Sequence, residues 1–126
     1  MHTLTIGTVA KRAGLRTSAI RYYESAGVLP PPQRESGQRR YAQDVFVRLA
    51  VIRAARKLDF SMAEIRALFH AFPDDTTLSD RWHALARLKI VEMNALIDRA
   101  ESIRTMLTES LGCECATFDQ CAMLAE

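Results

Sequence analysis

The apolar residues of the chain recur at the three- and four-residue steps of helices, and glycines, prolines and polar turns separate these stretches. Near the amino terminus, a helix is predicted to begin near Thr8 and to end at Gly14, which supplies the positive φ of a helix end. The apolar face of this helix would carry Val9, Ala10 and Ala13.

A second helix is predicted directly after this one. Thr17 or Ser18 can cap its start, and the helix would run to about Ala26 with Ile20 facing inward. Gly27 would close it. Two helices separated by only about four residues have the spacing of a helix-turn-helix.

The next segment cannot continue a helix, because the prolines of "VLPPPQ" fix φ and remove amide donors. The polar turn "RESGQRRYAQ" follows it. A third helix is predicted from Gln43 to about Lys57, with an apolar face made of Val45, Leu49, Ile52 and Ala55. The sequence "SMAE" is a capping box of Ser61 and Glu64, and it predicts a short helix through about Phe69.

The segment "FPDDTTLSD" is a linker, and the long stretch from Leu78 to Leu111 after it contains neither Gly nor Pro. A helix of that length would extend roughly 50 Å at about 1.5 Å per residue. Its apolar seam predicts a coiled coil with a second copy of the chain; the alternative is packing against its own domain. The seam residues are Met93, Leu96, Ala100, Ile103 and Leu107.

The predicted fold class is therefore mainly α, with three parts. Residues 1–72 form a DNA-binding domain with linking helices, residues 73–111 a dimerisation helix, and residues 112–126 a cysteine-rich loop and tail. No apolar run reaches the roughly 18 residues of a membrane span, and no signal peptide is visible, so we expect a cytoplasmic protein.

Charge divides the chain more sharply than its net value of +2 suggests. Residues 1–57 carry eleven Lys or Arg against three acids, a net charge of +8, whereas residues 58–126 carry six against twelve, a net charge of −6. Such a polycation attracts a phosphate backbone, although a solvated basic surface would show the same charge. Nucleic acid is the expected partner of the first half.

The candidate DNA contacts lie on the second helix and in the polar turn after the prolines. A helix-turn-helix lays its second helix in the major groove, while neighbouring basic groups hold phosphates. The helix would present Ser18, Arg21 and Tyr22 to the groove. The polar turn would act as a wing whose Arg34, Arg39 and Arg40 reach the phosphates.

The stretch from Thr5 to Tyr41 resembles the winged helix-turn-helix of MerR-type regulators. The shared positions are Arg21, Tyr23, Glu24, Gly27, Arg34, Gly37, Arg39 and Tyr41. The resemblance covers the whole chain and implies two linking helices, a long antiparallel dimerisation helix and a cysteine-bearing effector loop. It also adds Tyr23 and Tyr41 to the candidate DNA-binding residues.

The resemblance further implies a mechanism. Homodimers of this type bind promoter DNA between two elements that are spaced too far apart for RNA polymerase. An inducer makes the dimer bend and untwist the duplex until the elements align, so that deformation of the DNA regulates transcription. One dimer would thus repress and activate.

All three cysteines lie near the end of the chain, at Cys113, Cys115 and Cys121. Cytoplasmic thiols stay reduced, so this cluster favours metal binding over disulfides, while buried packing of free cysteines is the alternative. Three thiolates can close on one zinc ion or another soft thiophilic ion, leaving a fourth position open. The identity of the ion stays open at this point.

The cysteine pattern also resembles the redox-sensing SoxR branch, which holds a [2Fe-2S] cluster on four cysteines. Ser110 occupies the position of the first of these, so one ligand is missing. By the same resemblance, Trp82 of a second subunit could lie against the loop, with packing between helices as the alternative. The fold of the wider family also implies that Asp80 or His83 of that subunit could complete a divalent site. A third possibility is a thiol sensor without a cofactor, oxidised or alkylated directly at a cysteine.

A small thiol enzyme or metal carrier is the competing class of protein. An enzyme needs a general base beside its nucleophile, and none of the three histidines stands in a recognisable catalytic setting. A carrier has no need of a helix-turn-helix. We therefore expect a DNA-binding regulator that is not an enzyme.

Overall fold

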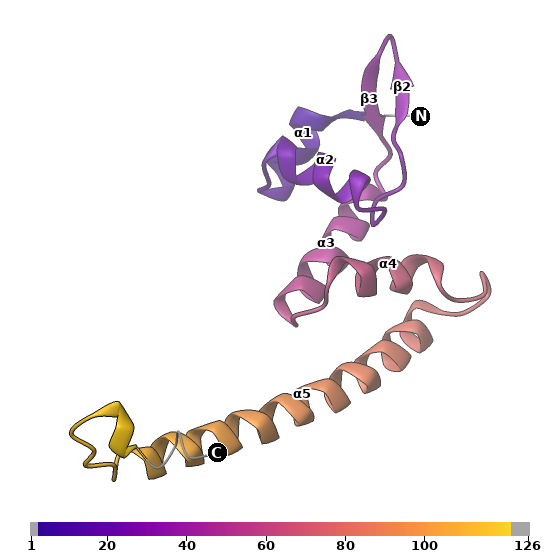
Figure 1. The fold of residues 1–126 in the computed structure, drawn as a ribbon. Coiled ribbons are helices and arrows are strands. Elements are labelled where there is room, and N and C mark those ends of the chain that lie inside the picture. Colours follow the sequence, from indigo (N-terminus) through magenta and orange to yellow (C-terminus); the bar gives the residue numbers. More distant parts are fainter. Residues whose placement is uncertain (1–2, 122–126) are drawn as a thin grey trace. The chain divides into compact units, whose positions relative to one another are not determined.

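The computed structural model describes residues 3–121, which are mainly helical (Figure 1). Within these residues, the contacts divide the chain into two compact units, residues 1–85 and 86–126. We call the first unit the head. The elements are β1 (Leu4–Thr5), α1 (Ile6–Ala13), α2 (Thr17–Ser25), β2 (Gln33–Glu35), β3 (Gln38–Tyr41), α3 (Val45–Lys57), α4 (Met62–His70), α5 (Leu78–Ser110) and the 3₁₀ helix η1 (Phe118–Gln120).

The structure confirms the predicted helix-turn-helix but moves the starts of both helices. α1 begins at Ile6 and not near Thr8, because the Oγ1 atom of Thr5 caps it by accepting from the backbone N–H of Thr8 at 3.2 Å. α2 begins at Thr17 after Arg16, so neither Thr17 nor Ser18 is its cap. The expected glycine ends α1: Gly14 has φ 67°.

The tight turn between these helices explains the early start of α2. The N–H of Gly14 donates to the Lys11 carbonyl at 3.4 Å, and the N–H of Leu15 donates to the Ala10 carbonyl at 2.9 Å. This pair of bonds is a Schellman motif, which satisfies the last carbonyls of α1 and reverses the chain at once. Only Gly14, Leu15 and Arg16 separate the two helices.

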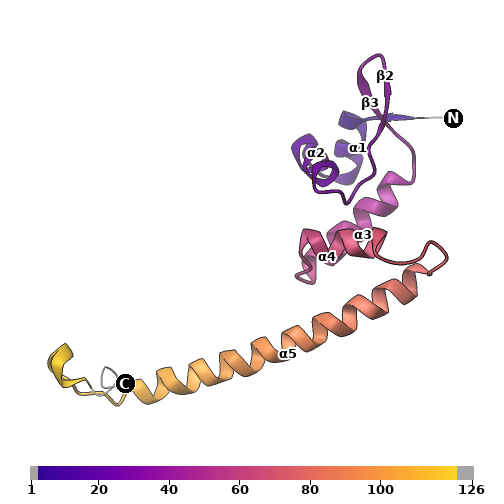
Figure 2. The same ribbon diagram turned by 45° about the vertical axis from the view of Figure 1, so that its right-hand side comes forward.

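The predicted wing is a hairpin of β2 and β3 within a small antiparallel sheet of order β1-β3-β2. Two residues join the strands, Ser36 with φ 51° and Gly37 with φ 80°. Positive φ at both positions is the geometry of a type I′ turn, which matches the right-handed twist of a hairpin. The hairpin projects from the head beside α1 and α2 in both ribbon views (Figures 1 and 2).

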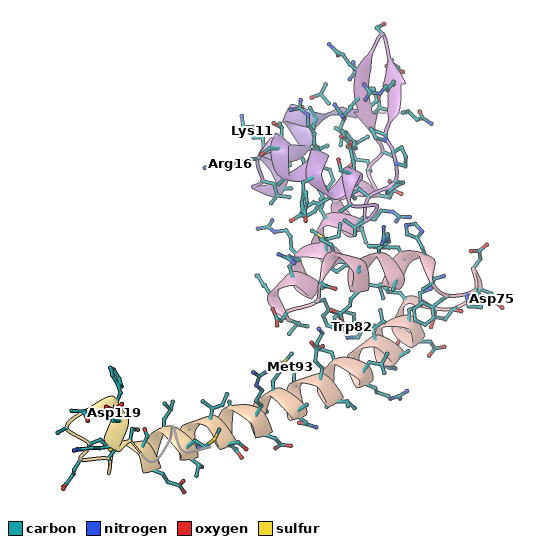
Figure 3. The ribbon with its side chains drawn as sticks, in the orientation of Figure 1. Lys11, Arg16, Asp75, Trp82, Met93 and Asp119 are labelled. Atoms are coloured by element: carbon teal, nitrogen blue, oxygen red, sulfur yellow. The ribbon has the colours of Figure 1, made fainter. Side chains whose placement is uncertain are left out.

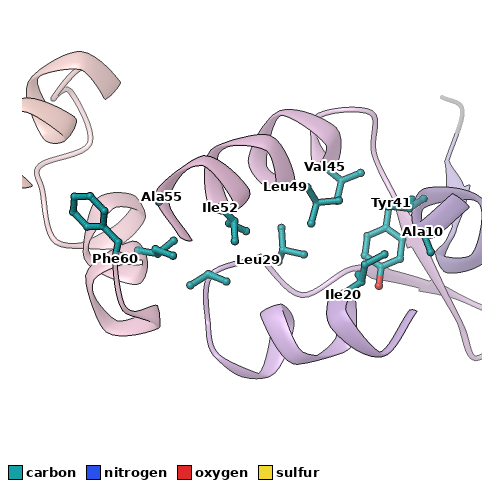
Figure 4. Packing of buried hydrophobic residues seen from close by; sticks show 12 residues of the cluster. Ala10, Ile20, Leu29, Tyr41, Val45, Leu49, Ile52, Ala55 and Phe60 are labelled. Carbon is teal, nitrogen blue, oxygen red and sulfur yellow. The ribbon is translucent and has the colours of Figure 1, made fainter. Parts of the chain in front are cut away.

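The core of the head lies between the helix-turn-helix and the helices α3 and α4. Ile20 of α2 and Ile52 of α3 are fully buried, and Ile65 of α4 is 1% exposed. Figure 4 shows side chains of this cluster along α3. The predicted apolar face of α3 is confirmed, because its four residues are buried: Val45, Leu49, Ile52 and Ala55.

α4 begins at the predicted capping box. The N–H of Glu64 donates to Ser61 Oγ at 3.1 Å, and the N–H of Ser61 donates to Glu64 Oε1 at 2.9 Å. The C-terminal end of α4 is held by Arg81, whose guanidinium donates to the carbonyls of Leu68 and Phe69 at 3.2 and 3.0 Å. The first turn of α5 is therefore fixed to the rest of the head.

The predicted long helix is confirmed as α5, whose 33 residues have a length of about 50 Å. Within residues 86–121, much of its apolar seam faces outward: Leu96, Ile103 and Leu107 are 47%, 41% and 63% exposed. None of the helices in residues 3–121 combines the length and apolar character needed to cross a bilayer. The domain limits expected from the sequence and the pairing of α5 with a second copy stay predictions.

The packing of α3 gives a stability test. Ile52→Ala leaves a cavity in the core, so it is expected to lower the free energy of unfolding by about 2–5 kcal/mol. Val47→Ala, on the exposed face of the same helix at 65% exposure, is the matched control and should change it by less than about 0.5 kcal/mol. Denaturant unfolding at one protein concentration, followed by circular dichroism, measures both; equal midpoints would contradict this assignment of the core.

Candidate DNA interface and metal centre

α2 presents a polar, solvent-exposed face that carries the predicted base-reading residues. Ser18, Arg21 and Tyr22 are exposed, Tyr22 at 56%, whereas Ile20 on the opposite face is fully buried. Tyr23 is half-buried and packs against the core. The structure therefore groups three of the four predicted residues of α2 on one accessible face and turns the fourth inward.

The wing concentrates basic side chains around its type I′ turn. Arg34 is exposed and donates to the Gly37 carbonyl at 3.2 Å, which fixes its side chain across the turn. Arg34 lies directly opposite Arg39 in the strand register. Arg40 is half-buried and forms an ion pair with Glu35 at 3.5 Å. Like charges directly opposite one another destabilise a hairpin, and the ion pair of Arg39 with Glu24 offsets this repulsion.

A buried carboxylate joins the wing to α2. Glu24 accepts from Arg39 Nε at 3.1 Å and also accepts a hydrogen bond from the hydroxyl of Tyr41. Its side chain is only 11% exposed, so little water competes with these bonds. Tyr41 is 4% exposed and faces the interior of the head. The sequence pattern did not assign a role to Glu24. An acid within a strongly basic segment was the only sign that it could form an ion pair.

Burial, followed by the hydrogen bond to Glu24, raises the pKa of the Tyr41 phenol well above its usual range. The phenol therefore stays protonated and keeps donating to the carboxylate throughout the neutral range. The charge of Glu24 is balanced by Arg39. The bond network thus holds α2 and β3 in a fixed relation.

A cleft of about 390 Å³ lies between the start of α1, α2 and the wing turn. Arg21 and Arg39 line it together with Thr5, which caps α1, and Ile6, the first residue of that helix. Two guanidinium groups beside a helix start suit an anion. Further basic residues are exposed around the α1–α2 turn, and Figure 3 shows Lys11 and Arg16 projecting from it. In the sequence, these residues counted only toward the net charge of residues 1–57.

The three cysteines come together where α5 ends. Their Sγ atoms all lie within 4.8 Å of one another. Gly112 and Cys113 donate their N–H groups to the carbonyls of Glu109 and Ser110 at 3.2 and 3.1 Å, which closes the helix. The chain then turns back through η1 and brings Cys121 to the other two thiols.

The thiols differ in their surroundings. Cys113 and Cys115 are exposed, and Cys121 is half-buried. The Sγ atoms of Cys113 and Cys115 are 2.8 Å apart, and Cys115 Sγ donates to the Gln120 carbonyl at 3.2 Å. The hydrogen bond with Cys115 lowers the pKa of the Cys113 thiol below its ordinary value. Cys113 and Cys115 are therefore not buried packing residues, so that alternative is wrong for these two cysteines.

The donor set can be tested against the two predicted metal groups. Three thiols fit a single soft ion, which accepts thiolate ligands. A [2Fe-2S] cluster needs four protein ligands, and the chain has three cysteines. Ser110 does not supply the fourth in this conformation, because its Oγ donates to the Leu107 carbonyl at 2.6 Å.

The predicted partner-subunit contacts lie in the first turns of α5. Asp80 and His83 are exposed, while the ring of Trp82 packs on Phe60 with 5.1 Å between the centroids (Figure 3). Trp82 therefore packs within the head. Contact of Asp80, Trp82 or His83 with a second chain stays a prediction. Residues 122–126 of the predicted tail lie outside the described residues.

The chain matches a family model described as MerR HTH family regulatory protein over residues 4–71 and a second model, MerR, DNA binding, over residues 46–110. The chain belongs to the MerR family. This MerR protein is therefore a DNA-binding transcription regulator and not an enzyme. The predicted winged helix-turn-helix architecture is confirmed with it.

Relatives named for different signals resemble this MerR protein over most of their length. It is 30% identical to a SoxR homolog of Chromobacterium violaceum, covering 96% of this chain and 82% of the relative. It is 33% identical to the mercuric resistance operon regulatory protein of Serratia marcescens, covering 86% and 75%. The structure of PbrR691 from Ralstonia metallidurans in complex with lead(II) matches with TM-score 0.77 and 27% identity over 97% of both chains.

The position of Tyr41 gives a pH test. Tyr41→Phe removes its hydrogen bond to a charged partner and is expected to cost about 1.5–3 kcal/mol at pH 8. Because the folded state raises the pKa of this phenol above that of the unfolded chain, about 10, the stabilisation is complete below pH 10 and is lost as pH rises above it.

The difference in stability between wild type and Tyr41→Phe should therefore shrink from pH 8 to pH 11. Denaturant midpoints at both pH values measure it, with Tyr22→Phe as the control, because this change removes the same hydroxyl from an exposed ring. If the difference in stability is the same at both pH values, the hydrogen bond from Tyr41 to Glu24 is not the source of the stabilisation.

Proposed function

We propose that this MerR protein binds promoter DNA as a homodimer and switches from repression to activation when a soft metal ion binds Cys113, Cys115 and Cys121. The observation that carries the proposal is the convergence of three thiol groups within 4.8 Å, in a chain whose head has the DNA-binding fold. The same function places the protein in the cytoplasm, with the DNA that it regulates.

DNA binding is proposed to use the exposed face of α2 and the wing. Ser18, Arg21 and Tyr22 would enter the major groove. The cleft lined by Arg21 and Arg39 would seat a backbone phosphate, and the like-charged pair of Arg34 and Arg39 would then face an anion. Arg40 would contact a neighbouring phosphate.

Tyr23 and Tyr41 are proposed to act from inside the head. Both are turned toward the core, so they shape the interface without reaching the duplex. Glu24 belongs to the same support, because its carboxylate holds Arg39 and Tyr41 against α2. A change at this carboxylate would alter the angle between the two elements that contact DNA.

The homodimer is proposed to form along α5. Residues 86–110 expose apolar side chains at helical spacing, among them Leu96, Ile103 and Leu107. Large contiguous apolar patches are rare on monomeric proteins and usually mark an interaction surface. Pairing with a second α5 would cover the stripe. Asp80 or His83 of that second copy would complete a divalent site at its open fourth position.

The switch is proposed to be a coupling between ion binding and the shape of the DNA. An ion can bias the dimer only if the thiol cluster binds it more tightly in the activating state. In that state the dimer would bend and untwist the promoter, so that its two elements align for RNA polymerase. The three-thiol donor set, and the relatives whose names refer to mercury and lead(II), support a soft ion over a [2Fe-2S] cluster.

Substitution of Arg21 tests the DNA interface. Arg21→Ala is expected to weaken operator binding by about 1–3 kcal/mol and to leave the metal content unchanged, because its proposed partner is DNA. Arg87→Ala removes the same charge from an exposed position outside the head and serves as the control. Mobility shifts at several salt concentrations, with elemental analysis of the same samples, decide it. Loss of metal with intact DNA affinity would reverse the assignment.

Substitution of the thiols tests the sensor. Cys113→Ser and Cys121→Ser should each lose the bound ion and the induced transcription but keep operator affinity, because the cluster lies outside the head. Elemental analysis and a visible spectrum of anaerobically purified protein identify the ion, since zinc is colourless and an iron-sulfur cluster is coloured. Unchanged induction by every soft ion tested, in both variants, would exclude the thiol cluster from the mechanism.

A further inference from the structure

Two of the three thiols stand apart from the third by their geometry. Cys113 and Cys115 have Sγ atoms 2.8 Å apart and are both exposed, whereas Cys121 is half-buried. One residue, Glu114, separates them in the chain. A reagent in solution therefore reaches both sulfur atoms of the pair.

This separation is already close to that of a covalent bond. A disulfide has an S–S distance of about 2.05 Å, so the two sulfur atoms need to approach by less than about 1 Å. Residues 113–115 follow the end of α5 and precede η1, and they form no regular secondary structure. The N–H of Cys113 bonds the Ser110 carbonyl at the end of α5, and the rest of the segment lies outside the helical and strand ladders.

We propose that a hydroperoxide joins Cys113 and Cys115 in a disulfide and thereby switches off metal binding at the cluster. One sulfur, as thiolate, attacks one oxygen of the O–O bond and becomes a sulfenic acid, while the other oxygen takes up a proton and leaves as an alcohol, or as water when the oxidant is hydrogen peroxide. The second sulfur attacks the sulfenic sulfur, forms the S–S bond and releases water. Two thiols lose two electrons, and one peroxide gains them.

The consequence for the ion rests on the proposed function. A disulfide sulfur is no longer a thiolate ligand, so Cys121 alone would remain of the three donors. A bound ion would in turn shield the pair from peroxide. The ring that this disulfide closes is very short, and a disulfide across a short loop adds little stability. Thiol reductants should therefore reopen the disulfide. The loop would thus respond to a soft ion only while the cell is reducing.

The test uses the full-length, metal-free, reduced protein and hydrogen peroxide, followed by alkylation of the remaining thiols and mass spectrometry with fragmentation between the cysteines. The expected product has lost two hydrogens between Cys113 and Cys115 and carries one label, on Cys121. Zinc binding should be lost in this product and return with dithiothreitol, and operator affinity should not change. Prior loading with zinc should slow the reaction.

Two variants provide matched controls. Cys121→Ser should still form the disulfide, whereas Cys115→Ser should form no disulfide within the chain. A bond from Cys113 to Cys121, a bond between two chains, or a label spread evenly over the three cysteines would overturn the proposal. If the reduced protein binds no zinc yet forms the disulfide, the metal function fails and the oxidation stands; if it binds zinc and forms no disulfide, the oxidation fails and the metal function stands.

Discussion

The arrangement of the head depends on one buried carboxylate. Glu24 lies on α2, and its partners Arg39 and Tyr41 lie on β3, so a single side chain connects the two elements that face DNA. A buried charge is tolerated only when it is paired and hydrogen-bonded, and here both conditions are met. The proposed bending of DNA would put a load on the head, and this bond network would brace α2 and β3 against it.

The same bond network also affects how positive charge is distributed over the head, in a chain with a net charge of only +2. Arg39 is neutralised by Glu24, and Arg40 is paired with Glu35. Arg21 and Arg34 remain beside them on the surface of α2 and the wing. In the proposed complex, Arg39 and Arg40 would contact phosphates from positions fixed by their ion pairs, and Arg21 and Arg34 would add further positive charge.

The carboxyl-terminal unit presents groups that a second copy of the chain is proposed to complete. The apolar stripe of α5 is exposed within residues 86–110, and three thiolates would leave one ligand position of a tetrahedral ion for another group. Dimerisation and sensing would then share one requirement. The oxidation proposed for Cys113 and Cys115 acts within one chain, so it would not depend on that second copy.

The sequence by itself determined the helices, because their signals are local: Gly14 ends α1, the Ser61–Glu64 box starts α4, and the spacing of Val45, Leu49, Ile52 and Ala55 marks the buried face of α3. Residue types also indicated the MerR family and the thiol donors of the cysteine cluster.

Other features depend on contacts between distant segments, and only the tertiary structure decided them. Glu24 meets residues that follow it by 15 and 17 positions, which turns Tyr41 from an expected DNA contact into a buried support. Trp82 packs on Phe60, which lies before the linker. The 2.8 Å approach of Cys113 to Cys115 likewise depends on how the chain turns after α5, and side-chain spacing along a sequence carries no information about such distances.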